Sequence, residues 1–579
     1  MEYAALVDLY ERLADTDSTN AKRDILAGAF AAADEQLDRL VTLVRGRLDP
    51  AADRRELGVS SSLTLAAICK ATGASEAAVR DQWRESGDLG DAAAWAVEHG
   101  GQQTLFSEPL TVERVHGTLR DLAGYEGPGS QSRRVDAIAG LLADGGPGEA
   151  RYIVRTALGH LRVGVGEGTI RDAIAAAFLD GSDEAVDAVE RAYQMTNNFR
   201  AVAETARDEG LPGLDRLDIE LYRPVQVMLA EKADSLPVAL ADAAVDGRAR
   251  CEIKYDGIRV QIHVGDEVRL FTRRLEDVTA QFPDVVRAVE AGVTADRVVL
   301  DGELVGYTPD TVAGERAPVP FQQLSRRVKR EADIEAMARE VPVVVHLFDC
   351  LTVEGETLLR DPLSTRRDRL ADAYEPVPPE PSAGRAGLEG ARAEWVTVTE
   401  SADGPEATPD AAERLYESAL TEGHEGLVVK NPAAAYEPGR RVGRLLKVKP
   451  TMEPLDLAVS RAVYSEGRRS DMLGRLYLAC YDPDADELRE VGRLSTGYTD
   501  EELAALTDRL EDDIVSREGR AVDLHSDVVL EVEYEEIQAS PEYDSGYALR
   551  FPRFLGVRED LDPADADTLS RIEQLYDSQ

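Results

Sequence analysis

The sequence predicts a multidomain α+β protein, with an all-α N-terminal region, a central region of mixed strands and helices, and a small C-terminal β-barrel. Three observations support this prediction. The chain has 579 residues, and domains of about 100–200 residues would divide it into three or four. Hydrophobic residues make up 43% of it, which is enough to build folded cores. The apolar spacing also changes along the chain, from three or four residues to two.

Residues 1–215 have the periodicity of helices. Leu6, Tyr10 and Leu13 recur at intervals of three or four residues, which places them on one face of an amphipathic helix. Alanine-rich runs follow, separated by turns such as GYEGPGSQS at residues 124–132. We therefore expect an all-α domain in this part of the chain.

Residues 216–449 are expected to form a mixed α/β domain. From about residue 250, apolar and polar residues alternate on both sides of Asp256-Gly257, a pair typical of hairpin turns. Residues 374–394, rich in proline, glycine and alanine, are interpreted as an exposed loop within this domain. Further strand-like runs occupy residues 297–307, 341–350 and 424–430.

Residues 450–579 are expected to form a small β-barrel. Short alternating runs at residues 475–494 and 528–537 are separated by acidic and glycine-containing turns. Several short strands connected by such turns are typical of compact barrels.

The charge of the chain is strongly acidic. It has 110 acidic and 66 basic residues, which gives a net charge of −44, and only eight of the basic residues are lysines. Abundant acidic residues with few lysines are typical of proteins that work in concentrated salt, where self-repulsion is screened. An ordinary acidic protein is the alternative. A net charge of −44 normally argues against a nucleic-acid partner, but a salt-adapted composition reflects the solvent more than the ligand.

Missing motifs exclude several classes of protein. No Gly-Lys pair occurs, which excludes a P-loop NTPase, and the protein kinase motifs are absent. No histidine pair has the spacing of an HExxH zinc site. The four cysteines are far apart, which argues against a zinc ribbon or a disulfide scaffold and for a reducing compartment, the cytoplasm. No run approaches the roughly 18 apolar residues of a membrane span, so no membrane partner is expected.

Lys254 is the candidate nucleophile. It stands just before Asp256-Gly257, and Arg259 follows five residues later. A lysine amine attacks only in its deprotonated form, which desolvation and neighbouring cations favour. Residues 430–449 supply such cations, with six basic residues against one acidic residue. In so acidic a chain, this local excess favours phosphate binding over a solvated surface.

Two glutamates are candidate ligands for a divalent cation. Glu303 and Glu425 each adjoin a glycine at the end of a predicted strand, and carboxylate oxygens are the ligands that such cations prefer. Taken singly, each also fits an ordinary surface position. Phe348, taken alone, fits a core residue.

Six short segments, in their order and spacing, resemble the nucleotidyltransferase motifs of ATP-dependent DNA ligases. They are KYDGIR (254–259), FTRRLEDVT (271–279), DGEL (301–304), HLFDC (346–350), EGLVVK (425–430) and LKVK (446–449). Residues 151–169 and 548–560 look like the corresponding segments of archaeal replicative ligases. Together with the acidic, lysine-poor composition, they make the chain resemble an archaeal, halophilic member of the family. The resemblance implies an all-α DNA-binding domain at 1–215, an ATP-grasp-like nucleotidyltransferase domain for adenylation at 216–449, and an OB-fold β-barrel at 450–579.

The resemblance also implies a role for each matching residue. Lys254 would carry AMP through a phosphoramidate bond. Glu303 and Glu425 would serve the ribose and a Mg²⁺ ion, with Mn²⁺ as the other candidate metal. Around the nucleotide, the implied residues are Glu252 at the adenine, Arg259 at ribose and phosphate, Phe348 stacked on the base, and Arg273 near the nucleotide or the nicked strand. The cations implied to neutralise phosphate charge are Lys430, Arg441, Lys447 and Lys449.

One motif departs from the family pattern. Members often end in Arg-x-Asp-Lys, but this chain ends the motif with Leu561. Without the lysine, Arg558 and Asp560 alone would orient the leaving pyrophosphate, so the role of this motif stays open.

The implied partner is nicked duplex DNA, bound by a monomer. Candidate contacts for it are the basic run at residues 326–330 and the segment 430–449. Gln102–Phe106 resembles the short motif by which archaeal ligases bind the sliding clamp, PCNA. A loop in which Leu105 and Phe106 pack inward is the alternative.

The implied activity is ATP-dependent nick sealing through lysyl-AMP, in replication, recombination and repair. The alternatives are an RNA ligase or capping enzyme, which would not need the helical N-terminal region, and a catalytically silent DNA-binding scaffold, which would not need Lys254 and both glutamates. An NAD-dependent ligase would need a four-cysteine zinc site, which the scattered cysteines do not form.

Overall fold

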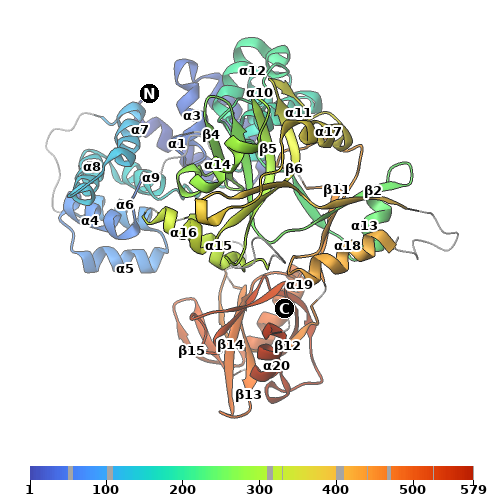
Figure 1. Ribbon diagram of the computed structural model, residues 1–579. Coiled ribbons are helices and arrows are strands. Elements are labelled where there is room, and N and C mark those ends of the chain that lie inside the picture. Colours follow the sequence, from blue (N-terminus) through green and yellow to red (C-terminus); the bar gives the residue numbers. More distant parts are fainter. Residues whose placement is uncertain are drawn as a thin grey trace. The chain divides into compact units, whose positions relative to one another are not determined.

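The computed structural model describes residues 1–49, 57–100, 109–309, 317–328, 330, 332–398, 410–439, 441–450, 452–465, 471–525 and 527–577. The chain divides into two compact units, Met1–Val448 and Lys449–Gln579. Helices make up the blue N-terminal part of Figure 1, and strands predominate in the second unit, drawn in orange and red. The predicted α+β fold class, with helical, mixed and β-rich parts, is confirmed. The boundaries proposed between three domains stay predictions.

The N-terminal part of the first unit is helical because its sequence combines amphipathic periodicity with clear helix starts. Helix α1 buries Leu6, Tyr10 and Leu13, as the periodicity predicts. Side chains of Ser60 and Asp88 accept hydrogen bonds from the first turns of α4 and α6, which stabilises those helix ends. The helices are α1 (Tyr3–Ala14), α2 (Thr19–Ala31), α3 (Leu37–Leu43), α4 (Ser61–Thr72), α5 (Glu76–Ser86), α6 (Leu89–His99), α7 (Val112–Asp121), α8 (Ser130–Asp144), α9 (Pro147–Ala157), α10 (Glu167–Phe178), α11 (Asp183–Thr196) and α12 (Phe199–Leu214).

The rest of the first unit contains two sheets. A five-stranded sheet has the order β1-β11-β10-β2-β9, and a six-stranded sheet has the order β4-β3-β5-β6-β7 with β8 beside β6. The strands of the first sheet are β1 (Leu229–Lys232), β2 (Arg248–Ile253), β9 (Ala393–Thr397), β10 (Leu427–Lys430) and β11 (Arg441–Val448). Those of the second are β3 (Ile258–Val264), β4 (Val268–Thr272), β5 (Val298–Gly306), β6 (Val343–Val353), β7 (Glu356–Thr357) and β8 (Gly387–Gly390). The helices are α13 (Leu236–Ala243), α14 (Pro283–Gly292), α15 (Phe321–Val328), α16 (Ile334–Glu340), α17 (Leu363–Ala373) and α18 (Asp410–Thr421).

The hairpin expected at Asp256-Gly257 is wrong. Strand β2 before this pair belongs to the five-stranded sheet, and β3 after it belongs to the six-stranded sheet, so the segment is a crossover between sheets. The glycine is needed for space, because a Cβ at Gly257 would lie 2.3 Å from the carbonyl oxygen of Leu304. The segment therefore passes directly over β5.

The exposed loop expected at residues 374–394 is also wrong in part. Residues Gly387–Gly390 form β8, which pairs in parallel with β6. Leu388 is completely buried. The glycines that suggested a loop let β8 pack closely, since a Cβ at Gly387 would lie 3.0 Å from Val344.

The second unit is rich in strands, with an OB-like β-structure. A seven-stranded sheet carries a buried core that includes Leu457, Leu478 and Leu530. Helix α19 begins with a capping box of Thr499 and Glu502. The elements are β12 (Leu455–Val463), β13 (Arg475–Asp482), β14 (Glu487–Leu494), α19 (Asp500–Glu511), β15 (Ile514–Glu518), β16 (Ala521–Leu524), β17 (Val529–Glu533), β18 (Glu536–Ala539), β19 (Tyr547–Arg550), β20 (Arg553–Val557) and α20 (Leu569–Asp577).

Candidate active site

Lys254 lies where the chain leaves the five-stranded sheet for the six-stranded sheet. Its backbone N–H donates to the carbonyl of Gly426 (2.9 Å), and the N–H of Glu425 donates to the carbonyl of Lys254 (2.9 Å). These bonds extend the antiparallel pairing of β2 with β10. The Lys254 amine forms an ion pair with the Glu425 carboxylate, and the two side chains are 24% and 23% exposed. The candidate nucleophile and one candidate metal ligand are therefore adjacent and accessible.

Glu303 lies on β5 and interacts electrostatically with both members of this pair. Burial raises the pKa of Glu303 to about 8; Lys254 and Arg259 oppose the shift, and the neighbouring carboxylates Glu425 and Asp301 add to it. A carboxylate whose charge is unfavourable without a cation is suited to binding one. Glu303 and Glu425 are thus a chemically reasonable pair of ligands.

This pair would leave coordination positions of a divalent cation free. Among the described residues, no three histidine, cysteine, aspartate or glutamate side chains are arranged so that they could hold a metal ion by themselves. Mg²⁺ usually keeps several water ligands and binds one or two carboxylates together with substrate phosphates. The donor set therefore fits a cation that binds together with a nucleotide.

Glu252 carries a buried negative charge beside the site. It is 2% exposed, and its carboxylate lies 2.5 Å from the Lys430 amine, 2.7 Å from Arg250 and 3.8 Å from Arg367. Burial alone would raise the pKa of Glu252, but these three cations outweigh it and lower the pKa to about 2. Lys430, predicted to neutralise phosphate, is therefore held by Glu252 in this structure.

Phe348 is half-buried on β6 and close to two cations. The Lys430 amine lies 4.7 Å from the centre of its ring, and the Arg259 guanidinium lies 5.4 Å from it. An aromatic ring beside a buried carboxylate offers a stacking surface and a hydrogen-bond acceptor in one place. That combination suits a nucleobase, and it differs from the core position that Phe348 suggests by itself.

Arg259 is fixed by groups that sequence reasoning missed. Its guanidinium donates to both carboxylate oxygens of Asp301 (2.7 and 3.1 Å) and to the carbonyl of Met228 (2.5 Å). Asp301 is fully buried and also accepts from the Tyr436 hydroxyl (2.8 Å). The DGEL motif contains Asp301 and could have pointed to it, whereas Arg367 beside Glu252 carries no sequence signal.

Arg273 lies apart from these residues. It is exposed after β4 and lines a hollow of about 270 Å³ together with Arg47 and Arg274. Asn197 also lines the hollow; it is 1% exposed, and its Nδ2 has no hydrogen-bond partner among the described residues. Guanidinium groups and a buried amide donor make this hollow suitable for a phosphate.

The predicted basic segment 430–449 is not one surface. Lys447 lies on β11, between β1 and β10. Lys449 is the first residue of the second unit, where its amine lies 3.3 Å from Glu535. Arg440 and the side chain of Arg441 lie outside the described residues.

In two other predicted charge motifs, an arginine forms ion pairs with acidic residues of the protein itself. In the basic run at 326–330, Arg327 is 1% exposed and pairs with Asp284, so the expectation that it contacts DNA is wrong. Lys329 lies outside the described residues. Arg558 pairs with Asp560 (2.8 Å) and with Asp456, within the second unit.

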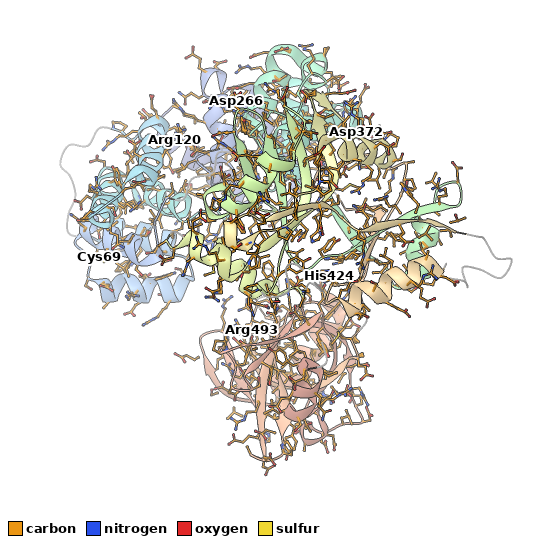
Figure 2. The ribbon with its side chains drawn as sticks, in the orientation of Figure 1. Cys69, Arg120, Asp266, Asp372, His424 and Arg493 are labelled. Atoms are coloured by element: carbon orange, nitrogen blue, oxygen red, sulfur yellow. The ribbon has the colours of Figure 1, made fainter. Side chains whose placement is uncertain are left out.

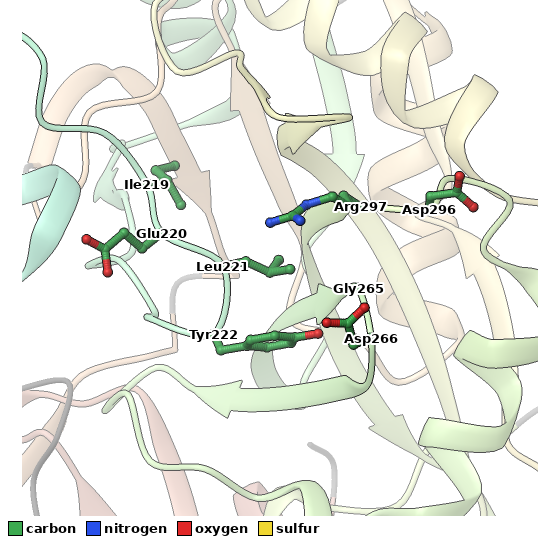
Figure 3. Close-up of a pocket in the computed structure, with 8 residues that line it drawn as sticks. All are labelled: Ile219, Glu220, Leu221, Tyr222, Gly265, Asp266, Asp296 and Arg297. Carbon is green, nitrogen blue, oxygen red and sulfur yellow. The ribbon is translucent and has the colours of Figure 1, made fainter.

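A second hollow of the first unit is lined by none of the predicted site residues. Figure 3 shows this hollow of about 710 Å³. Its charged lining groups are mainly acidic, namely Glu220, Asp266 and Asp296, with one arginine, Arg297. It therefore does not match the phosphate chemistry that the motif residues suggest.

Comparisons with known proteins agree with the motif geometry. Residues 227–449 match the family described as ATP dependent DNA ligase domain, residues 2–175 match DNA ligase N terminus, and residues 469–561 match ATP dependent DNA ligase C terminal region. The DNA ligase of Thermococcus fumicolans is 41% identical over 100% of this chain and 98% of its own length. The chain belongs to the ATP-dependent DNA ligases. Nick sealing is the function of that family.

Relatives from salt-loving organisms are about equally similar. The DNA ligase of Halorubrum lacusprofundi is 42% identical over 99% of both chains, and that of Haloarcula marismortui is 42% identical over 100% of both. A solved structure titled "Pmar-Lig_PreS3" has a TM-score of 0.58 at 18% identity, covering 95% of this chain and 99% of its own. That structural similarity supports the ligase fold.

Three other expectations have different outcomes. The four cysteines are free thiols, as the absence of a disulfide framework predicts. Within the described part of the chain, no helix is long and apolar enough to cross a membrane. The clamp motif at Gln102–Phe106 lies outside the described residues.

Proposed function

We propose that this ligase seals nicks through AMP carried on Lys254, with Glu303 and Glu425 as its metal-binding carboxylates. The observation that carries the proposal is the meeting of three motifs at one crossover. Lys254 pairs with Glu425 and interacts with Glu303, beside a ring and a buried carboxylate suited to a base.

In the first step, the Lys254 amine attacks the α-phosphate of ATP. A phosphorus–nitrogen bond forms, the phosphorus–oxygen bond to pyrophosphate breaks, pyrophosphate leaves, and the proton that the amine gives up passes to water. The ion pair of Lys254 with Glu425 has to open first, because a paired ammonium has no free electron pair. Mg²⁺, or Mn²⁺ in its place, held by Glu303 and Glu425, would supply positive charge against the phosphate oxygens.

The base side of the site is built before the nucleotide arrives. Glu252 is ionised by its three cationic neighbours, so it remains a hydrogen-bond acceptor at neutral pH. Phe348 lies on β6 between Leu347 and Asp349, which both pair with β5. Arg259 is held by its hydrogen bonds to Asp301. Groups already held in place lose little freedom when a ligand binds. This supports adenine and ribose contacts for Glu252, Phe348 and Arg259.

The nicked duplex is the second substrate. AMP passes from Lys254 to the 5′-phosphate, and the 3′-hydroxyl then displaces AMP to close the strand. Arg273, with Arg47 and Arg274 in the same hollow, is proposed to contact a backbone phosphate. Lys447, Lys449 and Arg441 are proposed to neutralise phosphate charge. Since one chain supplies all these residues, a monomer is sufficient. The free thiols of its cysteines fit the reducing cytoplasm.

Labelling tests the proposal. The protein is incubated with α-labelled ATP and Mg²⁺, and the labelled peptide is identified by mass analysis. We expect label on Lys254, no label after EDTA treatment, and no label on Lys254→Ala. Lys70→Ala, which removes an exposed lysine paired with Asp136 on the helical part, is the matched control and should label normally. Label on a different residue would contradict the assignment.

We also propose that Gln102–Phe106 binds the sliding clamp, on the motif alone. Leu105→Ala combined with Phe106→Ala should weaken clamp binding in titration calorimetry while labelling of Lys254 stays normal. Unchanged clamp affinity would instead favour inward packing of the two side chains.

A further inference from the structure

Three chain neighbours of the proposed reacting groups meet behind the active site. Tyr255 directly follows Lys254, and His424 directly precedes Glu425. His346 lies on β6 opposite Glu303 of β5 in the cross-strand register. Each of the three proposed reacting groups therefore has an aromatic neighbour, on a different segment of the chain.

These three rings contact one another. The rings of Tyr255 and His346 are stacked, with centres 3.9 Å apart and planes 15° from parallel. The ring of His424 meets Tyr255 edge-on, with centres 4.8 Å apart and planes 72° apart. All three residues are buried, at 8%, 3% and 8% exposure for Tyr255, His346 and His424. Stacked and edge-to-face contacts are the two geometries that aromatic rings favour.

Two of the rings also have polar contacts to other segments of the chain. His346 Nε2 lies 3.0 Å from the Tyr307 hydroxyl, and its Nδ1 lies 3.2 Å from Glu389. The Tyr255 hydroxyl accepts from the backbone N–H of Arg392 (3.0 Å). His424, labelled in Figure 2, lies in the turn between α18 and β10.

We propose that Tyr255, His346 and His424 are positioning residues that hold Lys254 at the distance from Glu303 and Glu425 that adenylation needs. The inference rests on the proposed function, since it concerns the same three reacting groups. The rings connect the crossover after β2, the centre of β6 and the turn before β10, which no single sheet contains. His346 is the central member, because it stacks on Tyr255 from the strand that pairs with β5.

The expected effect is on the rate of adenylation and not on nucleotide affinity. The ring contacts of the cluster join its three members to one another, whereas the Phe348 ring of the proposed base pocket lies beside Lys430 and Arg259. Loss of a ring would let the crossover move relative to β5. A misplacement of about 1 Å can slow a reaction about a hundredfold. The affinity for ATP should change little, because the groups that bind the nucleotide keep their places.

The test is single-turnover labelling of Lys254 over a range of ATP concentrations. His346→Ala should lower the maximal rate constant about tenfold or more, with the half-saturating ATP concentration within about twofold of wild type. His346→Phe keeps a flat ring and should recover most of the rate. The matched control is His263→Ala, because His263 is a fully buried histidine on β3 of the same sheet without contact to the cluster.

A merely structural role predicts a different result. Molecules that fail to fold reduce the labelled fraction but leave the rate constant of the remaining molecules unchanged. His424→Ala removes only the edge contact and keeps the test informative if His346→Ala does not fold; we expect about a threefold slower rate constant. Wild-type rate constants in both variants would overturn the inference, as would equal slowing by His263→Ala. Absence of label on Lys254 in the wild-type protein would overturn the proposed function itself.

Discussion

The helical and the sheet-containing parts of the first unit use charge in opposite ways. On α5, Arg80 pairs with Glu76 at the surface, with side chains 44% and 63% exposed. Between β6 and α17, Arg366 pairs with Asp349 at 1% and 6% exposure. Surface pairs contribute roughly 0–1 kcal/mol, whereas removing one partner of a buried pair costs about 3–5 kcal/mol. Loss of the Arg366–Asp349 pair should therefore cost far more than loss of the Arg80–Glu76 pair, although the helical part also has a mostly buried pair, Arg155 with Asp88, at 12% and 6% exposure.

This difference follows from what each part has to position. A helix buries apolar side chains and leaves charges in water, so the acidic surplus of the chain can be placed there at little cost. At the candidate active site, by contrast, charged side chains must be held in fixed positions away from water. Asp349 follows Phe348 directly, so the buried bond to Arg366 also fixes the end of the proposed base pocket.

The largest effect should come from breaking the buried pair of Arg366 with Asp349. Arg366→Met leaves Asp349 unpaired and also removes donors to the carbonyls of Asp361 and Ala434. We expect a loss of about 3–5 kcal/mol in the free energy of unfolding, measured by denaturant titration in molar KCl. Adding Asp349→Leu should restore part of the loss, because no charge is then left buried. A loss under about 1 kcal/mol would place this pair with the surface pairs.

The buried carboxylate of Glu252 should make the free energy of unfolding depend on pH. Its pKa is lowered from 4.5 to about 2, so it contributes stability above pH 4.5 that is lost as pH falls toward 2. That contribution is on the order of 3 kcal/mol at neutral pH. Glu252→Gln should lower stability at pH 7 and flatten the decline between pH 5 and pH 3 in denaturant titrations. An unchanged slope in that range would mean that other acids dominate it.

The parts differ equally in how far the sequence predicts them. The spacing of Leu6, Tyr10 and Leu13 predicts α1 because a helix repeats locally. In the sequence, Asp256-Gly257 looks like a hairpin turn. The group against which it packs, the carbonyl of Leu304 on β5, is distant in sequence, so no local pattern indicates the crossover. The motifs predict the meeting of Lys254 with Glu425, which the structure contains.

The groups that support the site could not be predicted in the same way. Arg367 at Glu252 lies outside any local pattern. The HLFDC motif contains His346, but nothing in the motif indicates that its ring stacks on Tyr255, because only the folded sheets bring the two residues together. Charge alone also misled: Arg327 stands in a basic run, yet it is buried against Asp284.

The salt dependence of nick sealing should distinguish the effect of the net negative charge from that of the cations proposed to contact phosphate. Screening reduces the self-repulsion of a −44 chain and its repulsion of DNA, while salt also weakens phosphate contacts. With so large an acidic surplus, we expect screening to dominate, and nick sealing in a KCl series to rise severalfold toward molar salt. A maximum at low salt with steady decline would contradict the salt-adapted interpretation and leave the ligase family unaffected.

The smallest effect should come from the surface pair on α5. Arg80→Ala removes the bond to Glu76, one turn away on the same helix. Both side chains are solvated, and such pairs contribute about 0.3–0.5 kcal/mol in isolated helices. We therefore expect a change below about 0.5 kcal/mol in the free energy of unfolding at low salt, and none in molar KCl, where the attraction is screened. Arg366→Met, measured under the same two conditions, should keep its full loss, because a buried pair is hardly screened. Equal salt sensitivity of the two variants would show that burial does not divide the charges of this molecule as proposed.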